Sequence, residues 1–169
     1  VEVAHRQQIQ GEVEEAVALL LDLVGQGPVH HRGRQHAGAE ATGRQPEHLA
    51  AVTGTNGKTS VASFTKQIWE HMGLKAASVG TLGVIAPGYN EYTGMTTPDP
   101  VTLHKAMSDL CDLGIDHVVF EASSHGLAQH RVDAIGFDIG VVTNITHEHL
   151  DYHGSYEAYH AAKARLFED

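Results

Sequence analysis

The chain has 169 residues, of which 41% are hydrophobic and 19% are charged, so it has the composition of a soluble globular protein with one main domain. Its formal net charge of -10 argues against a general nucleic-acid binder or a membrane-surface binder, because those partners attract clustered Lys and Arg. The single cysteine, Cys111, excludes an internal disulfide, and no apolar run approaches the ~18 residues needed to span a bilayer.

Residues 1–43 differ in character from the rest of the chain. They combine Gln-rich and His-rich patches with one apolar run, residues 17–24, which could form a helix. The stretch 25–45 has many glycines and little hydrophobic periodicity. Because such a stretch has no clear way to bury a face, we expect it to be a loop or to be disordered.

In the rest of the chain, short apolar runs alternate with segments of helical pattern. Strands are expected at residues 49–53, 76–79, 82–85, 117–120 and 139–142, and helices at residues 58–71, 100–113 and 156–167. Asp99 and Ser155 are suitable N-caps, and Gly73 and Gly114 are suitable helix stops. Residues 86–95 are rich in Gly, Pro, Asn and Tyr, so an exposed loop is expected there. This order predicts an α/β fold, with a mostly parallel sheet and helices on both faces.

A glycine-rich segment, GTNGKTS at residues 54–60, joins the first expected strand to the first expected helix. Small residues let backbone N–H groups approach phosphate oxygens, and the helix points its positive end at the anion. Lys58 would reach the terminal phosphates, and the Thr59 hydroxyl could bind Mg2+. The general phosphate-loop pattern has a glycine at the position of Val52. The competing interpretation is an ordinary turn that happens to contain Lys, but the flanking strand and helix favour nucleotide binding.

Polar residues follow three of the expected strands, at the edge where an open parallel sheet binds its ligands. Glu121 ends one strand, and its carboxylate could hold Mg2+ or simply lie in solvent. The segment 143–153, after the last strand, contains three histidines and two acids. It offers no clear zinc ligand set, and His is a less common Mg2+ ligand than a carboxylate. From the residues alone, Lys163 would be a solvated surface lysine.

Four segments of the chain, in the same order, resemble motifs of the Mur ligases: GTNGKTS at residues 54–60, TTPDP at 96–100, EASSHGLAQHRV at 121–132 and TNITHEHLDYHGSYEAYHAAKARLF at 143–167. The resemblance is closest to the members that add the third residue of the peptidoglycan stem peptide. It implies the P-loop-type central domain of that family, in incomplete form, over residues 44–169. The family's loop is the shorter TGTNGKT form, which accounts for Val52.

The resemblance also implies roles for individual residues. The ATP-binding loop would consist of Gly54, Thr55, Asn56, Gly57, Lys58, Thr59 and Ser60. Lys58 and Lys163 would be catalytic. The Mg2+ ligands would be Thr59, Glu121, His149 and Lys163, the last after CO2 converts its amine to a carbamate. The positions that look like those binding the UDP-sugar peptide are Thr96, Thr97, Ser123, Gln129 and Arg131.

The reaction implied is phosphorylation by ATP of the terminal carboxylate of UDP-N-acetylmuramoyl-L-alanyl-D-glutamate. The amine of diaminopimelate or lysine then attacks the acyl phosphate, which forms the amide bond of a cell-wall precursor. Catalysis of this kind consists mostly of positioning and electrostatic stabilisation. We expect a cytoplasmic monomer that binds neither nucleic acid nor membrane.

Two alternatives stay open at this point. One is a sister ligase with the same loop, such as a folylpolyglutamate or cyanophycin synthetase, although the SSHGL and HEHLDYHG segments favour the muramyl enzyme. The other is a non-catalytic nucleotide-binding fragment. Because only the central domain is recognisable, we expect the chain alone to have little or no ligase activity.

Residues 1–43 do not resemble the family's N-terminal domain. We hypothesise that they come from a shifted reading frame or a mispredicted gene start, because their composition is unusual and the resemblance begins abruptly. Sequencing of the genomic locus tests this, and a continuous in-frame upstream domain would contradict it.

Overall fold

The computed structural model describes residues 44–168, so the expectations for residues 1–43, including the helix at 17–24, lie outside the described part. The strands are β1 (His48–Thr53), β2 (Ala76–Gly80), β3 (Gly83–Ala86), β4 (Tyr89–Glu91), β5 (His117–Glu121) and β6 (Ile139–Val142). The helices are α3 (Lys58–His71), α4 (Pro100–Asp112), α5 (Ser124–Ala128), α6 (Leu150–His153) and α7 (Tyr156–Glu168). None of these helices is long and apolar enough to cross a membrane.

The strands form one six-stranded sheet in the order β4-β3-β2-β5-β1-β6. The four strands β2, β5, β1 and β6 run parallel, whereas β3 and β4 add an antiparallel hairpin at one edge. This confirms the mostly parallel sheet. The register pairs Val52 of β1 with Glu121 of β5. The segment after β1 and the side chain of Glu121 therefore lie at the same edge of the sheet.

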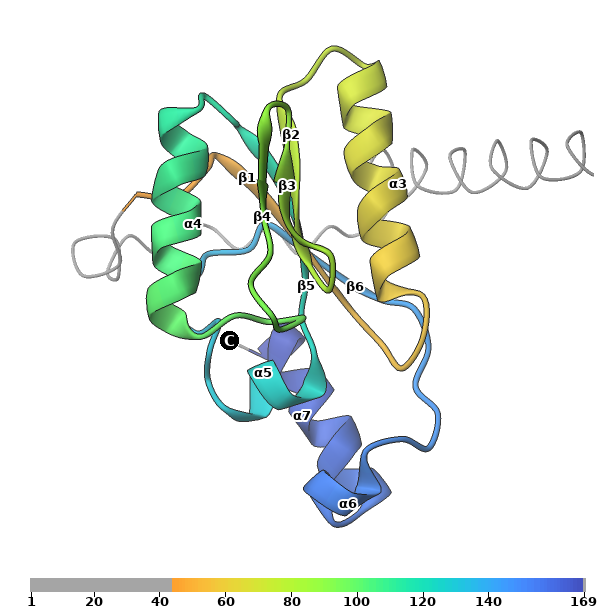
Figure 1. The fold of residues 1–169 in the computed structure, drawn as a ribbon. Helices are drawn as coiled ribbons and strands as arrows, with labels where there is room; N and C mark the ends of the chain where they lie inside the picture. Colours follow the sequence, from red (N-terminus) through yellow and green to blue (C-terminus); the bar gives the residue numbers. More distant parts are fainter. Residues whose placement is uncertain (1–43, 169) are drawn as a thin grey trace, which may run out of the picture. The chain divides into compact units, whose positions relative to one another are not determined.

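Helices cover both faces of the sheet, with α3 and α4 on opposite sides (Figure 1). Alternate side chains of β5 point to opposite faces, as in any strand. Val118 and Phe120 belong to the larger hydrophobic cluster, which includes the buried face of α4. Val119 belongs to the smaller cluster, together with Ala62 of α3. Burial on both faces explains why these strands are nearly continuous apolar runs.

The predicted helix ends are confirmed. The Asp99 carboxylate accepts backbone N–H bonds of 3.0 and 3.1 Å from the first turn of α4. The Ser155 hydroxyl accepts one of 3.1 Å from the first turn of α7. Gly73 and Gly114 follow α3 and α4 with φ values of 82° and 70°, which favour glycine. Local capping chemistry therefore made these boundaries readable from the residues.

The expectation of an exposed loop at residues 86–95 is wrong in its middle, because β4 pairs there with β3. Gly88, with φ of 75°, makes the tight turn between the two strands. Leu82, expected to begin a strand, instead lies in a turn and is 55% exposed. The Pro-Gly pair at residues 87–88 marks a hairpin turn and not a long loop. The short helices α5 and α6 were also not expected.

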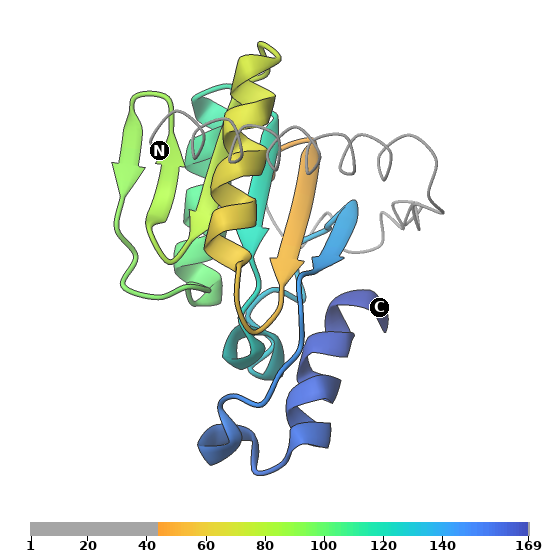
Figure 2. The same cartoon turned by 90° about the vertical axis from the view of Figure 1, so that its right-hand side faces the viewer.

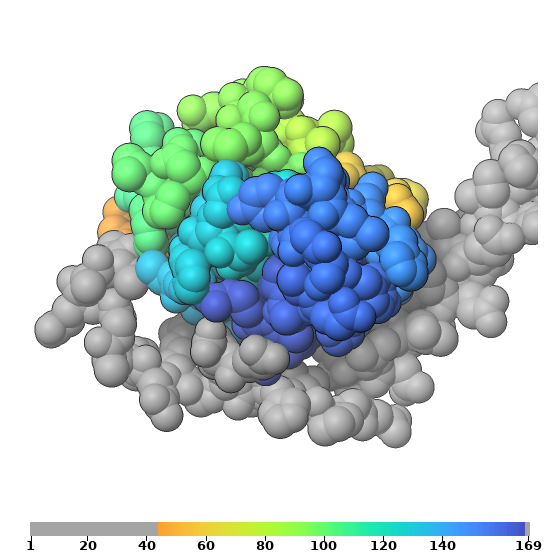
Figure 3. Space-filling model, turned by 90° about the horizontal axis from the view of Figure 1, so that it is seen from below, coloured from red at the N-terminus to blue at the C-terminus, as the bar shows by residue number. Residues whose placement is uncertain are grey.

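The carboxyl ends of the parallel strands point toward α5, α6 and α7 (Figure 2). α7 packs against both α5 and α6 and also contacts β1. Viewed from this end, the α5 region and the α6–α7 segment lie beside each other (Figure 3). The polar segments that follow the strands therefore gather at this end of the molecule.

Candidate active site

The phosphate loop, residues 54–60, leaves β1 and enters α3 at the carboxyl edge of the sheet (Figure 2). Gly57 precedes α3 in a left-handed conformation with φ of 88°. Gly54 has φ of 144°, and a Cβ atom there would lie 2.0 Å from the Thr143 hydroxyl oxygen. The loop thus passes so close to the end of β6 that only glycine fits. Ser60 lies exposed on the first turn of α3.

The segment after β6 braces the phosphate loop. The Asn144 side chain accepts a bond from the Asn56 backbone N–H and donates one to the Asn56 carbonyl, both at 3.1 Å. The Thr143 hydroxyl donates to the same carbonyl at 2.6 Å. The Thr55 N–H donates to the Asn144 carbonyl at 2.8 Å. The loop conformation is therefore set by the protein itself, which preorganises it for an anion.

Two lysines converge on this loop. Lys58 Nζ donates to the carbonyl oxygens of Gly54 and Thr55 at 2.8 and 2.9 Å. Lys163 is 2% exposed, and its Nζ donates to the same Gly54 oxygen at 2.7 Å. The prediction from the residues alone, that Lys163 would be a solvated surface lysine, is therefore wrong. The helical spacing of α7 buries this position against the loop.

Both lysines have a lowered pKa. Burial lowers the pKa of Lys58, and the carboxylates of Glu121 and Glu148 oppose this effect. The pKa of Lys163 is lowered to about 8, mainly by burial and in addition by the nearby charge of Lys58, while Glu148 opposes the change. A lysine with a pKa near 8 carries a substantial fraction of neutral, nucleophilic amine at ordinary cellular pH.

Glu121 lies beside the start of α3, next to the phosphate loop. Its carboxylate is 2% exposed and accepts a bond of 2.7 Å from the Thr59 hydroxyl. Thr81 donates to it twice, at 3.0 Å from its backbone N–H and at 3.2 Å from its hydroxyl. A Cβ atom on Gly80 would lie 2.0 Å from a Glu121 carboxylate oxygen. Glycine is therefore required beside this carboxylate.

The residues expected to bind the nucleotide-sugar peptide form a connected network next to Glu121. The Thr97 hydroxyl contacts the Ser123 hydroxyl at 2.8 Å and donates to the Glu121 carbonyl at 3.0 Å. The Arg131 guanidinium donates to the Thr97 carbonyl at 2.7 Å and to the Gln129 side chain at 3.0 Å. Thr96 joins through a 3.0 Å contact with Thr81.

His149 lies in a group of aromatic rings formed by α5, α6 and α7. Its ring centroid is 4.8 Å from that of His125 and 6.4 Å from that of Tyr159. His153 lies 5.5 Å from His125 and 5.4 Å from Tyr159. Burial lowers the pKa of His125 and of His153, and neighbouring histidines lower both further. At neutral pH these two rings are therefore neutral.

The predicted metal ligands fall into two groups around the loop. Thr59 and Glu121 are in direct contact, whereas His149 and Lys163 lie on the α6–α7 side. Among residues 44–168, no group of three or more His, Cys, Asp or Glu side chains could hold a metal ion by itself. Hard oxygen donors, a hydroxyl and a carboxylate, are the atoms that suit Mg2+, which usually takes further ligands from phosphate and water. The full ligand set stays a prediction.

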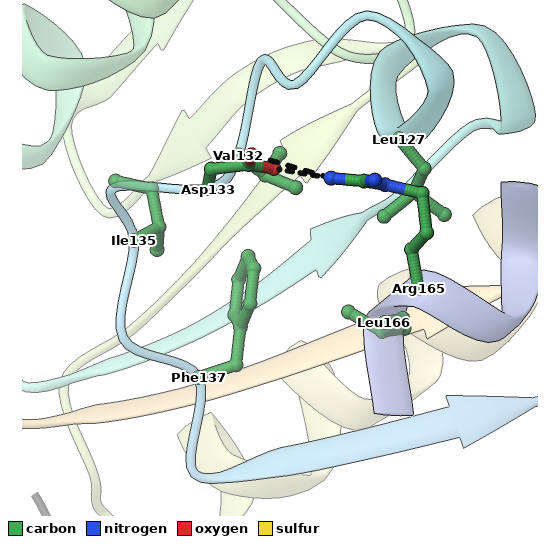
Figure 4. Close-up of a pocket in the computed structure, with 7 residues that line it drawn as sticks. All are labelled: Leu127, Val132, Asp133, Ile135, Phe137, Arg165 and Leu166. Atoms are coloured by element: carbon green, nitrogen blue, oxygen red, sulfur yellow. Dashed lines mark hydrogen bonds and ion pairs between the residues drawn. The ribbon is translucent and has the colours of Figure 1, made fainter. Parts of the chain in front are cut away.

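A small pocket lies away from these residues, between α7 and the segment that follows α5 (Figure 4). Its lining residues are Leu127, Val132, Asp133, Ile135, Phe137, Arg165 and Leu166. Arg165 and Asp133 form an ion pair of 3.3 Å across it. None of the predicted site residues lines this pocket, so the candidate site is the polar edge of the sheet.

Sequence reasoning missed several residues of the site. Thr81 directly follows β2, so the argument from polar residues at strand ends could have found it. The same argument included Asn144 in the polar segment after the last strand but gave it no role. Gly80 could not be found, because its role depends on the neighbouring strand. Tyr159 carried a weak signal, since it lies one helical turn before Lys163.

The chain matches the Mur ligase middle domain over residues 52–169. It is 56% identical over 131 residues to a UDP-N-acetylmuramoyl-L-alanyl-D-glutamate--2,6-diaminopimelate ligase of Chelativorans sp. (strain BNC1), a match that covers 78% of this chain and 27% of that protein. The ligase of the same name from Rhizobium meliloti (strain 1021) is 57% identical over 125 residues, covering 74% of this chain and 26% of that protein. The chain thus spans about a quarter of the length of these relatives.

A solved structure of a UDP-N-acetylmuramoyl-L-alanyl-D-glutamate--2,6-diaminopimelate ligase has a similar fold. It superposes with a TM-score of 0.67 at 38% sequence identity and covers 74% of this chain and 25% of that chain. Sequence and fold therefore agree on one family.

Proposed function

The chain belongs to the Mur ligase family of ATP-dependent amide-bond ligases, and we propose that it is the ATP-binding part of an enzyme that adds 2,6-diaminopimelate to UDP-N-acetylmuramoyl-L-alanyl-D-glutamate. The support for this substrate pair is the name shared by relatives that are 56 and 57% identical. The same name favours diaminopimelate over lysine and the muramyl enzyme over the sister ligases.

One observation carries the proposal for ATP. The braced phosphate loop, with the half-buried Lys58, lies beside the contact between Thr59 and the buried carboxylate of Glu121. Backbone N–H groups and the start of α3 suit the phosphate oxygens, and Lys58 supplies a positive charge for the terminal phosphates. Lys58 must leave the loop carbonyls to reach them. Such a site favours phosphoryl transfer by positioning and charge neutralisation.

The oxygen atoms of Thr59 and Glu121 fit Mg2+, and when bound the ion would neutralise charge on the phosphates of ATP. His149 and a modified Lys163 are proposed as the remaining protein ligands. The side chain of His149 is 46% exposed and so has room for a ligand. Phosphate oxygens of ATP and water would supply the other ligands, as Mg2+ prefers.

Lys163 is suited to modification by CO2. The neutral amine forms an N–C bond to CO2, one C–O π bond opens, and the nitrogen releases a proton to solvent. The carbamate nitrogen keeps one N–H, which preserves a donor for the Gly54 carbonyl. The change from a cation to an anion replaces the repulsion between Lys58 and Lys163 by attraction.

The network around Arg131 is proposed to bind the nucleotide-sugar peptide, with Thr96, Thr97, Ser123 and Gln129 as its other members. A guanidinium has five N–H donors, and its planar fork suits phosphate or carboxylate groups. Contacts with Thr97 and Gln129 fix the orientation of Arg131 beforehand. The carboxylate to be phosphorylated would then lie near Glu121 and the phosphate loop.

Titration calorimetry of the 169-residue chain with Mg-ATP tests the nucleotide proposal. Lys58→Ala should weaken binding by about 10- to 100-fold, because it removes charge-assisted hydrogen bonds worth roughly 1.5–3 kcal/mol. The exposed Lys75→Ala is the matched control and should bind as the unmodified chain does. Absence of Mg-ATP binding by the unmodified chain, or equal affinity of the Lys58 variant, would refute the proposal.

We further propose a cytoplasmic monomer that binds neither nucleic acid nor membrane. The formal net charge of -10 supports the absence of nucleic-acid and membrane binding, since polyanionic surfaces repel such a chain. The proposed use of ATP as a substrate supports the cytoplasmic location. Light scattering after size-exclusion chromatography tests the monomer, and a mass of twice 18.2 kDa would contradict it.

A further inference from the structure

Tyr159 is a completely buried tyrosine at the junction of α7 and the phosphate loop. It is 0% exposed and is absent from both hydrophobic clusters of the core. Its hydroxyl and ring contact four polar or ionisable side chains: Thr55, Lys163, His149 and His153. Tyr159 is one of the buried hydrophobic residues, but burial of apolar area does not account for these contacts of its hydroxyl and its ring.

The hydroxyl of Tyr159 contacts the Thr55 hydroxyl oxygen at 2.8 Å. That same Thr55 oxygen accepts a bond of 2.9 Å from the Thr146 backbone N–H and donates its own proton to the Thr146 carbonyl at 3.3 Å. A hydroxyl has one proton and two acceptor positions. Tyr159 is therefore the donor in its bond to Thr55, and it completes the hydrogen bonding of a phosphate-loop side chain.

The ring of Tyr159 lies under Lys163. Lys163 Nζ is 4.8 Å from the ring centroid while it donates to the Gly54 carbonyl at 2.7 Å. The two side chains are one helical turn apart on α7, so they share a face of that helix. Through them, α7 contacts two consecutive loop residues, Gly54 and Thr55. The lysine nitrogen thus contacts both the ring and the Gly54 carbonyl.

We propose that Tyr159 is a positioning residue of the ligase, with its hydroxyl fixing the phosphate loop through Thr55 and its ring holding Lys163 against the Gly54 carbonyl. This inference rests on the proposed function of the loop and of Lys163. It assigns the two parts of one side chain to two tasks, nucleotide binding and placement of the lysine nitrogen. The two tasks can be separated by substitution.

The experiment uses three variants of the 169-residue chain. Tyr159→Phe removes the hydroxyl and keeps the ring, and Tyr159→Met removes both while keeping an unbranched apolar side chain. Tyr156→Phe is the matched control, because Tyr156 lies on the same helix and stacks on His147 at 4.6 Å. Circular dichroism verifies the fold of each variant. Calorimetry gives the Mg-ATP dissociation constant, and 13C NMR with labelled bicarbonate gives the carbamate signal that Lys163→Met lacks.

Tyr159→Phe should raise the Mg-ATP dissociation constant about fivefold, the equivalent of one hydrogen bond, and keep the carbamate signal. Tyr159→Met should weaken nucleotide binding and also reduce the carbamate signal several-fold. Tyr156→Phe should match the unmodified chain in both measurements. A purely structural role would not produce this split between the two readouts.

Wild-type nucleotide affinity in Tyr159→Phe overturns the inference, and so does a full carbamate signal in a folded Tyr159→Met. If Tyr159→Met does not fold, Tyr159→Phe alone decides. If the unmodified chain binds no Mg-ATP, the proposed function fails and this inference fails with it. If the unmodified chain binds Mg-ATP in a Lys58-dependent way and Tyr159→Phe has no effect, only the inference fails.

Discussion

The side-chain nitrogens of Lys58 and Lys163 donate to one acceptor, the carbonyl oxygen of Gly54, at 2.8 and 2.7 Å. Two cations on one neutral oxygen are held together by hydrogen bonds against their mutual repulsion. The arrangement keeps the amine of Lys163 directly beside the phosphate loop, and the burial of its charge costs stability. This cost can be measured.

Lys163→Met should stabilise the fold and flatten its dependence on pH. The pKa of Lys163 is lowered from its ordinary value of 10.5 to about 8 in the folded chain. Below pH 8 the folded state bears the full cost of the buried charge, which is of order 3 kcal/mol from the pKa difference. The cost declines as pH rises from about 8 to 10.5, so stability should rise through this window, and the variant should lose that rise.

Urea denaturation at about pH 7 and pH 10, on either side of the folded pKa, measures this difference in CO2-free buffer. Lys75→Met, at an exposed lysine, serves as the control and should keep the rise with pH. A Lys163→Met variant that is less stable than the unmodified chain at neutral pH would show that the lysine is not under electrostatic strain.

Thr59→Val should uncouple Mg2+ from nucleotide binding. The variant keeps the volume of the side chain and removes the hydroxyl that donates to Glu121 at 2.7 Å. We expect affinity for Mg-ATP to fall about tenfold, from the loss of a metal ligand. Calorimetry with and without Mg2+ checks this, and affinity for ATP without Mg2+ should change little.

Ser63→Ala, one turn further along α3, is the control for this variant. An equal loss of affinity in the presence and absence of Mg2+ would mean that Thr59 serves the loop conformation and not the ion.

The sequence predicted the phosphate loop and Glu121 because both depend on local order, a polar residue directly after an apolar strand. It could not show that β2, β5, β1 and β6 are neighbours, since strand order arises from packing over long distances. Contacts between neighbouring strands could therefore not be predicted. One of them is the close approach of Gly80 to Glu121. The same limit applies to Tyr159, whose hydroxyl bonds Thr55 across 104 residues of chain.

Helix ends were predictable for the opposite reason. The caps at Asp99 and Ser155 act within one turn of helix, so the sequence contains all of the interacting groups. The β3–β4 hairpin was missed because the strand Tyr89–Glu91 is short and polar. Its pairing with β3, and not its own pattern, makes it a strand.

Gly80→Ala should displace the Glu121 carboxylate. The added Cβ atom would lie 2.0 Å from a carboxylate oxygen, so the side chain must move away from its bond with the Thr81 N–H. A buried carboxylate without its donors costs roughly 1–3 kcal/mol. We expect a lower melting temperature together with a loss of Mg-ATP affinity of at least about tenfold.

Differential scanning calorimetry and nucleotide titration check the two effects. The control is Gly136→Ala, where the added atom meets only the flexible side chain of Gln45 at 3.3 Å. Unchanged nucleotide affinity in Gly80→Ala would show that the exact place of Glu121 is unimportant for binding.

Asn144→Ala should weaken ATP binding by freeing the phosphate loop. Asn144 is exposed, and its side chain makes bonds of 3.1 Å with both the N–H and the carbonyl of Asn56 in the phosphate loop. Loss of two hydrogen bonds of about 1 kcal/mol each would free the loop, and part of the binding energy would then be spent on ordering it. We expect a loss of affinity of about tenfold, measured by calorimetry.

Asn90→Ala, at an exposed asparagine of β4, is the control and should bind as the unmodified chain does. Equal affinity of the Asn144 variant would mean that the bonds from Thr143 and the Asn144 backbone hold the loop without this side chain.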